Sequence, residues 1–175
     1  VELEVLAPPD RPAMPDLGPE DDNLAVRAAR AFIHARGGGA HIRLTKRRPT
    51  GAGLGGGSSD AGAVLRALNR QHPDPLSEAE LVRLAGSIGA DVPFFVTGAG
   101  LALAWGRGDR LLPLPPLPSA PVLLAIPPER INTAAAYGAL ARRRDGHAGA
   151  PSRLLSLPHA WRDVAAEAVN DFEDV

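Results

Sequence analysis

One glycine-rich segment constrains this chain more than any other part of the sequence. Residues 49–61 read P-T-G-A-G-L-G-G-G-S-S-D-A and separate a strand-like run from a helix-like run. Glycine in ordered structure costs roughly 0.5 to 1 kcal/mol per residue, so a cluster of glycines indicates a backbone that needs positive φ or close approach to a ligand. Ser58 and Ser59 stand where a helix would begin, and amides, hydroxyls and the helix dipole would meet an anion there.

The segment therefore predicts a loop that binds a polyphosphate. The residues expected to contribute are Pro49, Thr50, Gly51, Ala52, Gly53, Leu54, Gly55, Gly56, Gly57, Ser58 and Ser59.

Two known phosphate-binding patterns are alternatives to consider. A P-loop ends in Gly-Lys-Ser/Thr, whereas serine follows Gly57 here, so that motif is absent. A dinucleotide fingerprint, G-x-G-x-x-G, does match at Gly51, Gly53 and Gly56, with Asp74 near the expected downstream distance. The pattern leaves this interpretation open. Its context counts against it, because residues 77–88 predict a second amphipathic helix where a dinucleotide fold would return to a parallel strand.

A flexible Gly/Ser linker is the third alternative. Leu54 interrupts the glycines, Pro49 stiffens the entry, and a strongly amphipathic helix follows Ser58. These flanks favour a shaped turn over a linker.

The rest of the sequence predicts a mixture of helices and strands. Strands are expected at residues 1–6, 41–47, 101–105, 110–114 and 122–126, the third and fourth forming a hairpin. Helices are expected from a cap at Asp22 or Asn23 to 36, from about 58 onward, at 77–88 with a capping box at Ser77 and Glu80, at 133–143 and at 161–169. Residues 93–96 fit neither pattern clearly. Five prolines between Pro113 and Pro121 predict a linker to a second unit.

Composition narrows the class of partner. The 175 residues carry a net charge of −1 with scattered basic residues, which gives no nucleic-acid footprint and no polybasic membrane anchor. No run approaches the ~20 apolar residues of a membrane helix, and there are no cysteines for disulfides or thiolate chemistry. We therefore expect a cytoplasmic protein that acts on a small molecule. The single lysine, Lys46, is expected to be a solvated charge on the strand before the loop.

A second motif follows the predicted helix at 77–88. Residues 89–95 read G-A-D-V-P-F-F and place Asp91 among apolar residues directly after a helix stop. An aspartate in this position is most often a cap for the next turn. A catalytic carboxylate is the alternative.

Together the two motifs, about thirty residues apart, resemble those of the GHMP kinases, and within that family the branch that acts on a cytidine-diphosphate-linked methylerythritol. Asn23-Leu24 with residues 27–29, and the N-D-F-E run at 170–173, resemble the same branch. The resemblance implies an α+β fold: a ribosomal S5 domain 2-like ATP-binding domain over residues 1–118 and the start of a ferredoxin-like domain over 119–175.

The resemblance also implies a reaction. ATP, accompanied by Mg²⁺, would phosphorylate the 2-hydroxyl of the substrate in the non-mevalonate isoprenoid route, with the glycine-rich loop holding the ATP phosphates. Asp91 would accept the hydroxyl proton. Thr133 and Tyr137 match positions that meet the nucleotide end of the substrate, although Tyr137 could equally pack its own helix. Another GHMP kinase, of the homoserine or mevalonate type, and a non-catalytic nucleotide-binding module are the alternatives.

Some family motifs do not occur in this sequence. The opening P-A-K-x-N-L segment, the G-Y-H run and the late G-S-G-x-x-x-F-like motif are missing. We therefore expect a chain truncated at both ends, and one that is weak or inactive on its own.

Overall fold

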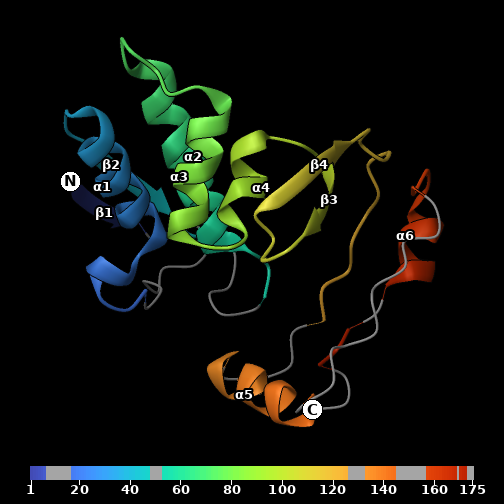
Figure 1. Ribbon diagram of the computed structural model, residues 1–175. Helices are drawn as coiled ribbons and strands as arrows, with labels where there is room; N and C mark the ends of the chain where they lie inside the picture. Colours follow the sequence, from blue (N-terminus) through green and yellow to red (C-terminus); the bar gives the residue numbers. More distant parts are fainter. Residues whose placement is uncertain (7–16, 48–52, 126–132, 145–156, 169, 173–175) are drawn as a thin grey trace. The chain divides into compact units, whose positions relative to one another are not determined.

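The computed structural model describes residues 1–6, 17–47, 53–125, 133–144, 157–168 and 170–172 (Figure 1). The chain divides into two compact units, Val1–Pro116 and Leu117–Val175.

The first unit opens with a parallel β-α-β arrangement. Strand β1, Glu2–Leu6, pairs in parallel with β2, His41–Thr45, from Glu2 opposite His41 to Leu6 opposite Thr45. Helix α1, Leu24–Arg36, connects them after a short 3₁₀ turn, η1, at Glu20–Asp22. The predicted cap is confirmed, since Oδ1 of Asn23 accepts a hydrogen bond of 2.9 Å from the backbone N–H of Ala25.

Three further helices follow. They are α2, Gly56–Gln71, then α3, Glu78–Ile88, and the short α4, Val92–Thr97. The capping box predicted at Ser77 and Glu80 is present, with the Ser77 hydroxyl and backbone N–H both donating to the Glu80 carboxylate at 2.6 and 2.9 Å. Residues 93–96, which the sequence left unassigned, belong to α4 because Asp91 and Pro93 start a new helical turn directly after Gly89 ends α3.

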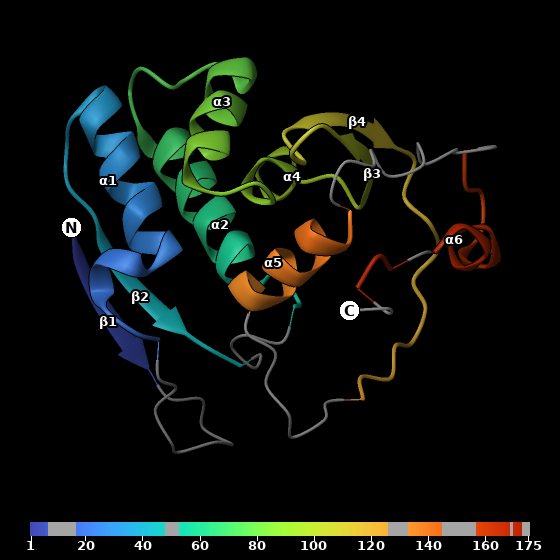
Figure 2. The same cartoon turned by 60° about the horizontal axis from the view of Figure 1, so that its bottom comes forward.

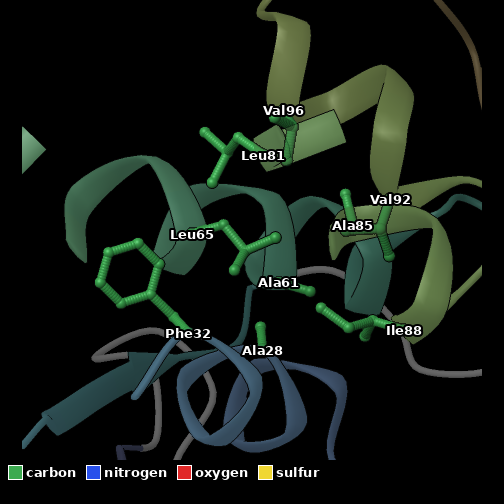
Figure 3. Close-up of a cluster of buried hydrophobic side chains, with 9 residues drawn as sticks. All are labelled: Ala28, Phe32, Ala61, Leu65, Leu81, Ala85, Ile88, Val92 and Val96. Carbon is green, nitrogen blue, oxygen red and sulfur yellow. The ribbon is translucent and has the colours of Figure 1, made fainter. Parts of the chain in front are cut away.

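The four α-helices of this unit pack around one apolar core (Figure 2). Each helix contributes one face, as its amphipathic spacing predicts. The core residues are Ala28 and Phe32 from α1, Ala61 and Leu65 from α2, Leu81, Ala85 and Ile88 from α3, and Val92 and Val96 from α4 (Figure 3). The core therefore holds α2 and α4 together, and these two helices carry the motifs singled out in the sequence.

The predicted hairpin closes the first unit. Strand β3, Leu101–Trp105, pairs antiparallel with β4, Arg110–Leu114. Gly106 and Gly108 in the connecting turn have φ of +71° and +90°, a backbone that favours glycine. A Cβ atom on Gly108 would lie 3.2 Å from the carbonyl oxygen of Ala90, so this turn packs against the segment that precedes Asp91.

The second unit contains α5, Thr133–Arg143, and α6, Trp161–Glu167. The strand predicted at 122–126 is wrong for the residues that the structure describes. Residues 121–125 have no regular secondary structure, and Val122, Leu123 and Leu124 are exposed. No described strand of this unit offers hydrogen-bond partners, so an extended apolar run has no ladder to join.

Candidate functional site

The glycine-rich loop leads directly into α2. The structure describes Gly53 to Ser59 of this loop, while Pro49, Thr50, Gly51 and Ala52 lie outside the described residues. Gly53 and Gly55 have φ of +69° and +63°, in the left-handed region where a Cβ is unfavourable. The backbone conformation therefore requires glycine at both positions.

The start of α2 leaves backbone donors without helical acceptors. The first helical bond runs from the N–H of Ser59 to the carbonyl oxygen of Gly55 at 2.8 Å. The N–H groups of the three preceding residues, 56–58, therefore have no acceptor within the helix. Gly55 occupies the N-cap position and has no side chain to cap them, and no other described side chain does so. The positive end of this 16-residue helix is therefore uncapped. It directly follows residues 53–55, the glycine turn.

Lys46 lies beside this helix start, and the prediction of a solvated charge is wrong. Its side chain is only 9% exposed, and Nζ donates a 2.7 Å hydrogen bond to Oδ2 of Asp60, whose side chain is 26% exposed. A Cβ on Gly56 would lie 3.4 Å from the same Nζ. β2 ends at Thr45, and the side chain of the next residue, Lys46, places its ammonium at the first residues of α2.

Sequence reasoning missed this ion pair because its partners are fourteen residues apart, on two sides of the loop. The signal available in the sequence was a pair of opposite charges, the single lysine before the glycines and an aspartate directly after the two serines. Neither residue alone indicates a contact.

Asp91 precedes α4 at the N-cap position. It is exposed, and its side chain makes no capping hydrogen bond. The capping role considered for this residue is therefore not observed. Among the described residues its carboxylate has no hydrogen-bond or ion-pair partner, which leaves its oxygens available as acceptors.

Helix α4 packs against the glycine turn through Phe95. Ring atoms of Phe95 would lie 3.2 and 3.3 Å from a Cβ on Gly55. Asp91 precedes Phe95 by four residues, a spacing that places two residues on the same side of a helix. The structure thus brings the start of α2 and the helix that follows Asp91 into contact, as Figure 3 shows for the core side of the same two helices.

The two residues predicted to meet the substrate lie in the second unit. Thr133 is the first residue of α5. Tyr137, on the same helix, is 61% exposed, and its ring meets that of Phe172 edge-on with centroids 5.0 Å apart. An exposed ring steadied by an aromatic neighbour can stack on a planar ligand.

The described residues contain no group of three or more His, Asp or Glu side chains that could hold a metal ion. Within the same parts of the chain, no helix combines the length and apolarity needed to cross a membrane.

Comparisons with known proteins agree with the two motifs. Residues 23–99 match the sequence family described as "GHMP kinases N terminal domain". A 4-diphosphocytidyl-2-C-methyl-D-erythritol kinase of Solibacter usitatus (strain Ellin6076) is 44% identical over 161 residues, which cover 88% of this chain and 51% of that protein.

Two more relatives carry the same name. The one from Chlorobium phaeovibrioides (strain DSM 265 / 1930) is 49% identical over 166 residues, or 91% of this chain and 56% of that protein. The one from Thermus thermophilus is 50% identical over 121 residues, or 68% of this chain and 42% of that protein. The chain spans about half the length of the curated relatives it matches.

Proposed function

This chain belongs to the GHMP kinase family, and we propose that it supplies the ATP-binding part of a 4-diphosphocytidyl-2-C-methyl-D-erythritol kinase. The proposed reaction transfers the γ-phosphoryl group of ATP to the 2-hydroxyl of the cytidine-diphosphate-linked methylerythritol, a step in isoprenoid precursor synthesis. The single observation that carries the proposal is the uncapped start of α2 behind the left-handed turn at Gly55. Relatives at 44 to 50% identity supply the substrate class.

The start of α2 fits the phosphates of ATP. Three N–H groups without helical acceptors and the positive end of the helix dipole meet at one place, and Ser58 and Ser59 belong to the first turn of the same helix. The ammonium of Lys46 adds a positive charge next to Gly56, although Asp60 shares it. Hydrogen bonds from such donors to an anion are roughly twice as strong as neutral ones.

Mg²⁺ would reach this site with the nucleotide. The described side chains do not form a cluster for a resident metal ion. Mg²⁺ usually takes one or two carboxylates and otherwise binds substrate phosphates and water. Asp91 or Asp60 could supply a carboxylate oxygen to such an ion.

Asp91 is proposed as the group that accepts the proton of the attacking hydroxyl. Its carboxylate is exposed and unpaired within the described structure, as an acceptor of a substrate proton must be. A well-placed general base contributes about 10² to 10⁴ in rate. The contact between α4 and the glycine turn supports a position near the transferred phosphoryl group.

The substrate's cytidine is proposed to meet the second unit. Thr133 would contact the nucleotide end, and the exposed ring of Tyr137 would stack on the base. We further propose that residues 1–118 form the ATP-binding domain and that residues 119–175 begin a ferredoxin-like domain.

The test compares Asp91→Asn with wild type. Phosphate transfer from ATP is measured with the cytidylyl substrate, homoserine and mevalonate as acceptors, and ATP binding is measured separately by calorimetry. Because several family motifs do not occur in this sequence, we expect weak transfer, and only to the cytidylyl substrate. Asp91→Asn should lower this transfer by a further factor of about 10² to 10⁴, with ATP binding retained. The control is Asp109→Asn, which alters another exposed carboxylate of the same unit, in the β3–β4 turn.

Three outcomes would contradict the proposal. Preferred transfer to homoserine or mevalonate would assign another GHMP kinase. Unchanged transfer in Asp91→Asn with ATP still bound would remove the catalytic role of Asp91. Nucleotide binding without transfer to any acceptor would favour a non-catalytic module.

A further inference from the structure

Phe95 occupies a place where two glycines of α2 make room for it. A Cβ on Gly55 would lie 3.2 Å from the Phe95 ring, and a Cβ on Gly62 would lie 2.7 Å from Cβ and 3.0 Å from the backbone carbon of Phe95. Gly55 is the N-cap residue of α2 and Gly62 lies within the helix, so Phe95 lies against the side of α2 on which both glycines stand. This face of α2 receives Phe95 and holds α4 at close range.

Phe95 differs from its neighbours on α4 in what it contacts. Val92 and Val96 belong to the apolar core cluster, whereas Phe95 does not and is only partly buried. Its ring is instead directed at Gly55, the residue whose left-handed backbone starts α2. A residue that served the core alone would not need to reach the turn.

The same helix links this contact to Asp91. Asp91 precedes Phe95 by four residues, so the two lie about one turn apart on one side of α4. Gly53, the other left-handed residue of the turn, has open space around it. The Phe95 ring thus connects the turn at Gly55 with the helix that directly follows Asp91.

We infer that Phe95 is a positioning residue that sets the glycine turn at the start of α2 and Asp91 in a fixed relation to each other. This inference rests on the proposed function, since the groups it positions are those assigned to the phosphates and to proton acceptance. Phe95 itself need not touch either substrate. Its removal should free the turn before it unfolds the protein.

The experiment compares Phe95→Ala with Phe94→Ala. Phe94 is the adjacent residue, is also partly buried, and packs edge-on against Phe95, yet it is not among the atoms that a Cβ on Gly55 would meet within 4 Å. Both variants lose the same volume from the same helix. A difference between them therefore reports on the contact with the turn rather than on the loss of a ring.

The main readout is hydrogen exchange of the Ser59 amide, which bonds to the Gly55 carbonyl oxygen, with the amide of Leu65 in the middle of α2 as reference. In Phe95→Ala, Ser59 should exchange on the order of tenfold faster relative to Leu65, the ratio that corresponds to one weakened hydrogen bond. Phe94→Ala should leave this ratio near that of wild type. Global destabilisation would accelerate both amides together and leave the ratio unchanged.

The second readout is the affinity for Mg–ATP by calorimetry. Phe95→Ala should bind about tenfold more weakly than Phe94→Ala, the effect of misplacing one donor to a charged group. Equal exchange ratios in the two variants would overturn the inference. If the ratio rises in Phe95→Ala but wild type binds no nucleotide, the positioning contact stands and the nucleotide site is wrong.

Discussion

Gly62→Ala is expected to destabilise this protein, although alanine is the better helix former. Gly62 lies in α2 and is buried against α4. An added Cβ would stand 2.7 Å from Cβ, 3.0 Å from the carbonyl carbon and 3.3 Å from the carbonyl oxygen of Phe95. These atoms are backbone or attached directly to it, so no side-chain rotation relieves the overlap.

The magnitude follows from two opposed effects. Replacing glycine by alanine inside a helix gains about 1 kcal/mol. Forcing an extra methyl group into a packed core costs about 1–3 kcal/mol, and the contact with backbone atoms puts this case at the upper end. We therefore expect a net loss of about 1–2 kcal/mol, or a fall in Tm of roughly 4–10 °C.

The matched control is Gly86→Ala. Gly86 lies in α3, where an added Cβ would meet only Cγ of Pro93 at an ordinary 3.9 Å. This variant should gain up to about 1 kcal/mol, because the helix propensity improves and nothing is displaced. Urea unfolding followed by circular dichroism measures both. If Gly62→Ala is as stable as Gly86→Ala, the close packing of α2 on α4 described here is wrong.

Three other predictions concern stability. Lys46→Met leaves the Asp60 carboxylate half-buried without its ammonium and should cost about 1–3 kcal/mol in urea unfolding; a solvated pair would cost under about 1 kcal/mol. Asn23→Ala removes the side-chain cap of α1 and should cost about 1 kcal/mol, with an unchanged midpoint contradicting the cap. The hydrogen bonds from the Ser77 hydroxyl and backbone lower the pKa of Glu80 below its usual range, so its stabilising effect is fully present above the unfolded pKa of about 4.3 and is lost as the pH falls through the lower pKa of the folded state. Glu80→Gln should thus differ from wild type in thermal unfolding at pH 7, and the difference should shrink as the pH is lowered below about 4.3. A difference that does not shrink would rule out the ionised carboxylate.

Local patterns predicted most of the helices and strands of the first unit. The caps at Asn23 and Ser77 act within three residues of themselves, so their chemistry is visible in the sequence. The glycine turn was predicted for the same reason. The strand at 122–126 failed because a strand needs a neighbour, and no local pattern can supply one.

The contacts that shape the candidate site could not be predicted in this way. Lys46 reaches Asp60 across fourteen residues, and Phe95 meets Gly55 from another helix. Both contacts depend on how the four helices pack, which the sequence does not display. The glycine turn and Asp91 were found by type and spacing, whereas the side chains that hold them emerge only from the packing.

The central claim is that the backbone at the start of α2 binds the phosphates of ATP. The most direct test is a titration of ¹⁵N-labelled protein with Mg–ATP, followed by the amide resonances of Gly53 to Ser59. We expect saturable shifts concentrated in these residues, and matching shifts with inorganic triphosphate but none with adenosine. Shifts that leave Gly53–Ser59 untouched while other amides respond, or no response at all, would contradict it.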